Sequence, residues 1–285
     1  MLAAITREVS RSLEACELTH LPRVGINLPL ARLQHQRYRD ALESLGCRII
    51  SVPAADDLPD GVFVEDVAIV FDELAIVTRP GAESRRAETA SVADTLRAFR
   101  TVAQVEAPGT LDGGDVLRLG RRVYVGASRR SNQSGIAQLA ALVEPHGYAV
   151  RSVPVSGCLH LKSAVTEVAP GMILVNPAWV DPALFGEVGA LAIDPSEPCA
   201  ANALLVRTAA GSKPAGDAGK DRGGEAAARI ARGFGPTAGV AIYPSSFPRT
   251  RRMLEARGIP LEIVDVSELQ KAEGAVTCCS LVFQV

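Results

Sequence analysis

The sequence lacks the features that are typical of nucleic-acid-binding proteins and of membrane proteins. Its 30 lysines and arginines nearly balance 32 aspartates and glutamates, so the formal net charge is −2 and the pI is near 6.1. No basic stripe of the kind that binds nucleic acid results from this balance. No stretch approaches the ~18 apolar residues that a membrane-spanning helix needs. We therefore expect a small-molecule partner, with no nucleic acid and no membrane.

Signals for export and for disulfide bonding are also scarce. The start, Met1 to Glu8, has no charged leader followed by an apolar core, and we therefore expect a cytoplasmic protein. The six cysteines contain no pair with the C-x-x-C spacing. This indicates reduced thiols rather than a disulfide framework or a structural zinc site.

The dominant pattern in the sequence is a repeat. Of 285 residues, 47% are hydrophobic and 22% charged, which predicts a substantial folded core. One unit, an apolar strand, a tight turn, a second strand, a helix and a third strand, occurs about five times. Its clearest copy is expected to have strands at 62–71, 74–78 and 102–105, with a Ser84-capped helix at 84–99.

The other copies follow the same order. The second covers 111–155, the third runs from 160 with a short helix at 182–188, and the fourth covers 201–264. A low-complexity stretch, about 209–235, interrupts the fourth copy and is predicted to be a mobile surface insertion. The fifth copy joins 277–285 to segments at 5–6, 33–45 and 48–52. Splitting one copy across the termini closes a ring, although an ordinary α/β sandwich remains an alternative.

The polar residues fall at equivalent positions of these units. Asp66, Asp112, His160 and Asn202 are separated by 46, 48 and 42 residues, and Cys278 follows after 76 residues that include the insertion. In a ring of repeats, equivalent positions converge on the axis. The pattern therefore predicts one central pocket.

The adjacent thiols Cys278 and Cys279 stand before the final apolar run, in a segment expected to be a strand. Free cysteines are usually buried and inert. Side chains in a strand alternate between its faces, so only one thiol is expected to face the pocket while the other lies in the core. We predict Cys278 as the nucleophile and His160 as its acid and base partner.

Two carboxylates, Glu65 and Asp66, lie within an apolar segment. Their burial would cost several kcal/mol unless a cation meets them, so they favour a cationic substrate. Asp112 to Asp115 reads either as a glycine turn with capping aspartates or as part of a metal site with His160. The metal site is less favoured, because thiolate, imidazole and hard carboxylates match no usual ligand set.

Six motifs together resemble the dimethylarginine dimethylaminohydrolase family of the pentein superfamily. In order along nearly the whole chain they are Gly61-Val62-Phe63-Val64-Glu65-Asp66-Val67, Thr78-Arg79-Pro80-Gly81, Leu111-Asp112-Gly113-Gly114-Asp115-Val116-Leu117, Leu159-His160-Leu161-Lys162-Ser163, Ala200-Ala201-Asn202 and Thr277-Cys278-Cys279-Ser280. The resemblance implies an α/β fold, a pentein five-bladed β/α propeller in a single domain at 1–285. It also implies hydrolysis of Nω-methylated arginines to citrulline and a methylamine, without cofactor or metal, by a monomer or homodimer.

The resemblance also implies roles for individual residues. Cys278 would attack as a thiolate paired with the His160 imidazolium, and Asp112 would orient His160. Asp66 and Glu65 would hold the guanidinium, and Glu65 is also counted with the catalytic groups. The arginines Arg85 and Arg130 would bind the substrate carboxylate. Asp60, with the backbone of Leu18 and Ala272, would face the α-amine.

Two other functions remain possible at this point. Arginine and agmatine deiminases of the same superfamily carry an aspartate two residues after the histidine, where this chain has Lys162. Losing that carboxylate removes a partner for unsubstituted N–H groups and favours methylarginines. A catalytically silent binding or scaffold protein of the same fold is the second alternative.

Overall fold

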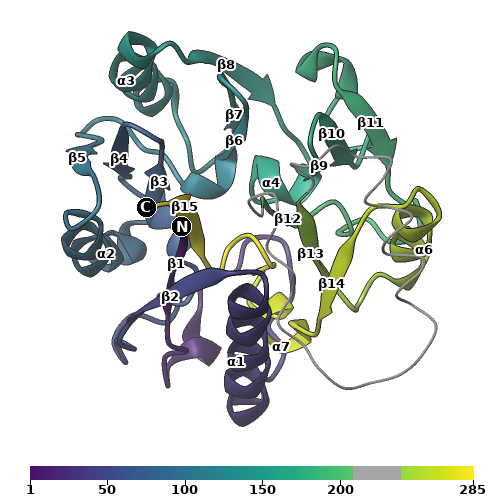
Figure 1. The fold of residues 1–285 in the computed structure, drawn as a ribbon. Coiled ribbons are helices and arrows are strands. Elements are labelled where there is room, and N and C mark those ends of the chain that lie inside the picture. Colours follow the sequence, from purple (N-terminus) through teal and green to yellow (C-terminus); the bar gives the residue numbers. More distant parts are fainter. Residues whose placement is uncertain (208–238) are drawn as a thin grey trace.

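Five three-stranded sheets surround a central axis in the computed structural model, which describes residues 1–207 and 239–285 (Figure 1). The inner strand of each sheet is antiparallel to the middle strand, which is parallel to the outer one. This confirms the predicted five-bladed propeller and excludes the sandwich. The predicted insertion at 209–235 lies outside the described residues.

The blades follow one another along the chain. Their strands are β1 (Leu2–Arg7), β2 (Cys47–Val52), β3 (Ala68–Val70), β4 (Leu74–Val77), β5 (Thr101–Gln104), β6 (Val116–Leu119), β7 (Arg122–Ala127), β8 (Ala149–Pro154), β9 (Val165–Ala169), β10 (Met172–Val175), β11 (Gly189–Ala192), β12 (Leu204–Val206), β13 (Val240–Pro244), β14 (Leu261–Val264) and β15 (Leu281–Gln284). The α-helices are α1 (Leu28–Ser44), α2 (Thr89–Leu96), α3 (Gln133–Val143), α4 (Leu161–Ala164), α6 (Pro248–Ala256) and α7 (Ser267–Gln270). The 3-10 helices are η1 (Leu13–Ala15), η2 (Val64–Val67), η3 (Glu83–Glu88), η4 (Gly113–Asp115), η5 (Glu144–His146) and η6 (Pro182–Phe185).

Helices connect the parallel strands of the blades, as such crossovers require. The helices α1, α2, α3 and α6 lie between a middle and an outer strand, and the short η6 does so in the third copy of the repeat. Apolar side chains pack between neighbouring blades and these helices. For example, Ile76, Val125 and Leu139 share one cluster from two sheets and α3. None of the described helices is both long and apolar enough to cross a bilayer.

The two chain ends complete one blade, as the sequence predicted. The last strand, β15, pairs antiparallel with β1 from Leu2 opposite Gln284 to Ile5 opposite Leu281. The outer strand, β2, then pairs parallel with β1. Both termini therefore lie side by side at the inner edge of this blade (Figure 1). The ring is closed by sheet hydrogen bonds rather than by a loop.

The segments that precede the inner strands are not strands, and this part of the prediction was wrong. Residues 64–67 form η2, 113–115 form η4, 161–164 form α4, and 276–279 form a turn. The predicted helix at 84–99 begins as η3, and Ala82 rather than Ser84 precedes it. In such a turn, two neighbouring side chains can point to opposite ends of the axis while their backbone stays beside it. The polar motifs therefore form turns, although the apolar residues on either side of them had predicted strands.

Candidate active site

One end of the axis holds a cavity that gathers most of the predicted site residues. It is formed by segments that precede the inner strands, together with side chains from η3 and from the loops around residues 17 and 130. Its lining includes Asp60, Asp66, Arg85, Arg130, His160, Ala272 and Cys278. Its volume of about 20 Å³ has room for about one water molecule. The structure therefore shows this site closed.

His160 stands between two carboxylates. Its Nε2 lies 3.0 Å from Oδ2 of Asp112, and its Nδ1 lies 3.7 Å from Oδ1 of Asp66. Burial, which leaves His160 4% exposed, would lower its pKa, but Asp66, Asp112 and Asp115 outweigh that effect and raise the pKa to about 9. His160 is therefore an imidazolium at neutral pH, which is the form that donates a proton.

This raised pKa predicts how stability depends on pH. The His160 pKa is 6.5 in its unperturbed state and about 9 in the fold. Its stabilising contribution is therefore complete below pH 6.5 and is lost as pH rises through 9. Relative to a His160→Gln variant, the free energy of unfolding of the native protein should fall by roughly 3 kcal/mol between about pH 6 and about pH 10. Urea denaturation across this range measures the difference, and a constant difference would contradict the assignment.

Asp66 is held ionised and in one orientation. Its Oδ2 lies 2.6 Å from Nη1 of Arg85, and its Oδ1 accepts the N–H of Gly114 at 3.1 Å. Burial would raise its pKa, but the cationic His160 and Arg85 dominate and lower the pKa to about 2. Asp66 thus presents a fixed negative charge to the cavity.

Arg85 is tied mainly to other protein groups. Its Nε and Nη2 bind both carboxylate oxygens of Glu88, at 3.1 and 2.8 Å, and Nη2 also lies 3.2 Å from the carbonyl oxygen of Phe63. Its buried guanidinium therefore has little donor capacity left for a ligand. Glu88 holds Arg85 against Asp66 and was not predicted as a site residue. The Arg-x-x-Glu spacing, which places the two side chains on one helix face, could have indicated this pair.

Asp112 connects three motifs. Its Oδ1 accepts the N–H of Gly81 at 2.8 Å, while its Oδ2 faces His160 and lies 3.9 Å from Nη1 of Arg130. A Cβ on Gly81 would lie 2.5 Å from the carbonyl oxygen of Arg130. Only glycine at position 81 allows its backbone to approach that of Arg130 so closely. The Arg-Pro-Gly motif therefore helps to shape the site.

The two glycines of Asp112-Gly113-Gly114-Asp115 are explained by close approach. A Cβ on Gly113 would stand 1.9 Å from the carbonyl oxygen of Glu65, and one on Gly114 would stand 2.6 Å from Nδ1 of His160. Asp115 accepts the N–H of Leu161 at 3.0 Å and thereby fixes the turn that carries His160. The motif is a glycine turn with anchoring aspartates.

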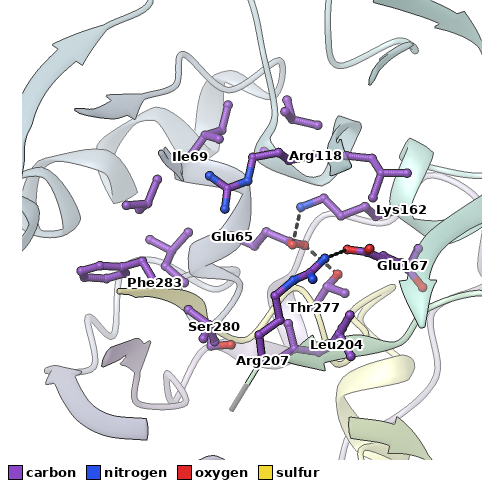
Figure 2. A pocket seen from close by; sticks show the side chains of 18 of the residues that line it. Glu65, Ile69, Arg118, Lys162, Glu167, Leu204, Arg207, Thr277, Ser280 and Phe283 are labelled. Carbon is purple, nitrogen blue, oxygen red and sulfur yellow. Dashed lines mark hydrogen bonds and ion pairs between the residues drawn. The ribbon is translucent and has the colours of Figure 1, made fainter. Parts of the chain in front are cut away.

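Glu65 lies beside the nucleophile but faces the other end of the axis. Its carboxylate binds Nζ of Lys162 and accepts the Thr277 hydroxyl at 2.7 Å, and its N–H donates to the carbonyl of Cys278 at 3.1 Å (Figure 2). It does not line the small cavity. In this structure Lys162 is the cation paired with Glu65, and a direct contact between Glu65 and a substrate guanidinium stays a prediction.

Asn202 fixes the residue before the nucleophile. Its Oδ1 accepts the Thr277 N–H at 3.1 Å, and its Nδ2 lies 2.9 Å from the Thr277 hydroxyl. These contacts join the fourth blade to the turn that carries the thiols. The repeat position of Asn202 thus corresponds to a structural clamp.

Cys278 and Cys279 lie in the turn before β15, and the predicted strand at this point is wrong. Cys278 is half-buried and lines the small cavity, whereas Cys279 is 0% exposed within a hydrophobic cluster. The expected division between pocket and core is therefore observed. Burial, then the charges of Glu65 and Asp66, raise the pKa of Cys278. This raised pKa favours the thiol form of Cys278 when no cation is bound, whereas a thiolate paired with an imidazolium was predicted for the reaction.

Residues 17–21 close over the cavity. The N–H groups of Thr19, His20 and Leu21 all donate to the carboxylate of Glu273, a residue with φ of 58°. The N–H of Glu17 donates to Oδ2 of Asp60 at 3.0 Å. Leu18 does not line the cavity but packs against a core cluster. The anticipated contact at Leu18 therefore requires rearrangement of this segment.

Three groups could in principle offer ligands to a metal ion. One donor atom each of Asp66, Asp112 and His160 lies within 4.8 Å of the other two. Arg85 is ion-paired with Asp66, and Arg130 lies near Asp112. These guanidinium groups repel a divalent cation, so the donor set fits a protonated imidazole better than a metal.

Comparisons with known proteins find relatives of one family that match nearly the whole chain. No family model matches the chain. A relative from Streptomyces coelicolor, named N(G),N(G)-dimethylarginine dimethylaminohydrolase, is 38% identical over 98% of this chain and 95% of its own. A cysteine-to-serine variant of the Pseudomonas aeruginosa enzyme with citrulline superposes with a TM-score of 0.83 at 31% identity, over 99% and 98% of the two chains. A histidine-to-glycine variant of such an enzyme, as its adduct with S-methyl-L-thiocitrulline, gives 0.82 at 31% identity over 99% and 100%.

Proposed function

The chain belongs to the dimethylarginine dimethylaminohydrolase family, and from this premise we propose that it hydrolyses Nω-methylated arginines to citrulline and a methylamine. The observation that carries the proposal is the meeting of Cys278, His160 and Asp66 at one cavity. These three groups supply a nucleophile, a proton donor and a partner for a cation. Their combination suits attack on a guanidinium carbon and its subsequent hydrolysis.

Asp66 is the group proposed to hold the guanidinium. It lines the cavity and stays ionised, whereas the charge of Glu65 is matched by Lys162. We assign Glu65 a positioning role through Thr277 and the backbone of Cys278.

Substrate binding is proposed to activate the nucleophile. The pKa of Cys278 is raised by burial and by nearby carboxylates, and a guanidinium placed beside the sulfur acts in the opposite direction. The thiol then passes its proton to solvent water, because His160 is already protonated, and the thiolate attacks the guanidinium carbon to form a carbon–sulfur bond. A neutral ligand such as citrulline brings no such charge, so it is expected to bind more weakly.

His160 is proposed to move protons in both halves of the reaction. As an imidazolium it protonates the departing methylamine while the carbon–nitrogen bond breaks, leaving a thiouronium on Cys278. The neutral imidazole then takes a proton from the water that attacks this carbon. The carbon–sulfur bond then breaks as the hydroxyl of the adduct becomes the citrulline carbonyl, and the hydroxyl proton passes to the sulfur and restores the thiol. Asp112 keeps the ring in place throughout.

The amino-acid end of the substrate is assigned to the mouth of the cavity. Arg130 faces the carboxylate, with Arg85 contributing mainly its charge because Asp66 and Glu88 use most of its donors. Asp60 and the backbone carbonyl of Ala272 face the α-amine. Binding requires that the segment 17–21 opens, because the closed cavity is too small for an arginine.

The proposed function predicts a strong preference for methylated substrate. Lys162 replaces the carboxylate that a deiminase uses, so nothing at that position pairs with unsubstituted N–H groups. We expect kcat/KM for asymmetric dimethylarginine to exceed that for arginine by roughly a hundredfold, measured as citrulline formed by the purified protein. Turnover of arginine alone would identify a deiminase, and no citrulline from either substrate would support a silent scaffold.

A further inference from the structure

A second cavity, which we call the axial cavity, lies at the other end of the axis. It has a volume of about 280 Å³, and all five inner strands, β3, β6, β9, β12 and β15, contribute to its wall. Pairs of consecutive residues lie at the boundary between it and the catalytic cavity, with one member of each pair lining each cavity. Glu65 and Thr277 line the axial cavity, whereas Asp66 and Cys278 line the catalytic one. A ligand in the axial cavity would therefore not occupy the substrate site.

The axial cavity has more hydrogen-bond donors than acceptors. Both oxygens of Glu65 are taken by Lys162 and Thr277, and the oxygens of Glu167 accept from Arg207 and the N–H of Gly171 (Figure 2). The ammonium of Lys162 has three N–H groups, yet its Nζ donates to no described residue except Glu65. Because the deep acceptors are already engaged, the surplus favours an anionic group.

Arg118 supplies a second cation, whose ion pair is long and exposed. Its only ion pair within residues 1–207 and 239–285 is with Asp72 at 3.5 Å, where the two side chains are 40% and 59% exposed. No hydrogen bond joins the side chain of Arg118 to another residue of the described chain, although its backbone belongs to the β6–β7 ladder. Figure 2 shows its guanidinium over the cavity, between Ile69 and Glu65 in this view. A carboxylate between Arg118 and Lys162 would receive charge-assisted hydrogen bonds from both.

The remaining wall is apolar. Ile69 on β3 and Leu204 on β12 line the same space (Figure 2), whereas the ring of Phe283 on β15 is directed away from it and packs against Phe99. A cavity near the lower end of the usual size range, with apolar walls and a few convergent polar groups, has the composition of a small-ligand site. An aliphatic chain would remove these side chains from water while its head group reached the cations.

We propose that the axial cavity binds a small amphipathic carboxylate, with its head group between Arg118 and Lys162 and its chain against Ile69 and Leu204. The ligand binds independently of the catalytic cavity, because the layer formed by Glu65 and Lys162 lies between the two sites. This site is additional to the proposed hydrolysis and does not depend on it.

The test uses octanoate as the probe and calorimetric titration of the full-length protein. Octanoate should bind, and Arg118→Ala should weaken binding about tenfold or more. The matched control is Arg151→Ala, which removes an exposed arginine from the outer strand of the same blade and should leave octanoate affinity unchanged. Both variants should keep the basal turnover of methylarginine.

Variation of the ligand tests the two ends of the site. Each methylene removed from the chain should weaken binding roughly fourfold, and the uncharged octanol should bind at least about tenfold more weakly than octanoate. Octanoate should remain bound when methylarginine is saturating. Competition with methylarginine, equal binding of octanol, full affinity in Arg118→Ala, or absence of binding would each overturn the proposal.

Discussion

Cys278→Ser is expected to lower citrulline formation by more than roughly a thousandfold while leaving the fold intact. A hydroxyl is far less acidic than a thiol, so a bound guanidinium can no longer generate the attacking anion. The change is nearly isosteric and lies in a half-buried turn, so the unfolding free energy should change little. Citrulline formation measures the loss, and circular dichroism with urea denaturation checks the fold.

The neighbouring thiol provides a matched control. Cys279 is fully buried and directs its sulfur toward the carbonyl of Ala275 at 3.4 Å. Cys279→Ser should therefore cost about 1 kcal/mol of stability, because a hydroxyl is buried in an apolar cluster, and should retain most of the activity. If Cys279→Ser were inactive and Cys278→Ser active, the nucleophile would be the second cysteine and the geometry of the turn would have been misjudged.

The ring could be predicted from the sequence because every blade has the same physical requirements, which recur as a repeat along the chain. Each blade must bury an inner strand and support it with a crossover helix, so apolar segments and helical segments recur in a fixed order. The split blade was also predictable, since the last apolar run had no partner near it in the chain. β1 and β2 supplied that partner.

The local geometry at the axis was not predictable from the same pattern. Apolar residues flank Glu65 and Asp66 on both sides, and such a run is typical of a buried strand. In the structure these residues form a 3-10 turn, so the two carboxylates face different cavities. Alternation of hydrophobicity does not distinguish a short strand from a turn whose side chains diverge.

The ion pairs of the site were equally inaccessible. From the sequence, we could note only that Lys162 stands where a deiminase has an aspartate. Its ion-pair partner, Glu65, is 97 residues away in the sequence, so the pair could not be predicted. Glu88 carries no motif, yet it holds Arg85 and thereby fixes Asp66. Such pairs depend on which blades are neighbours, and that follows from the closed ring rather than from any one segment.

His160→Ala is expected to lower turnover of asymmetric dimethylarginine by roughly 10²–10⁴-fold. Dimethylamine is a poor leaving group unless it is protonated, and His160 is the cation positioned to protonate it. S-Methyl-L-thiocitrulline carries a methanethiol leaving group, which departs without a proton. The variant should therefore still react with this compound and form the same thiouronium on Cys278.

Hydrolysis of that thiouronium should remain slow, because the variant has no base to activate water, so a covalent adduct should accumulate on the protein. Intact-protein mass spectrometry detects it, and peptide mapping should place it on Cys278. The matched control is His146→Ala, which removes an exposed histidine far from the axis and should turn over both compounds normally. If His160→Ala hydrolysed dimethylarginine at the native rate, or formed no adduct with the thiocitrulline, His160 would not be the proton donor and its two carboxylate contacts would have only a structural purpose.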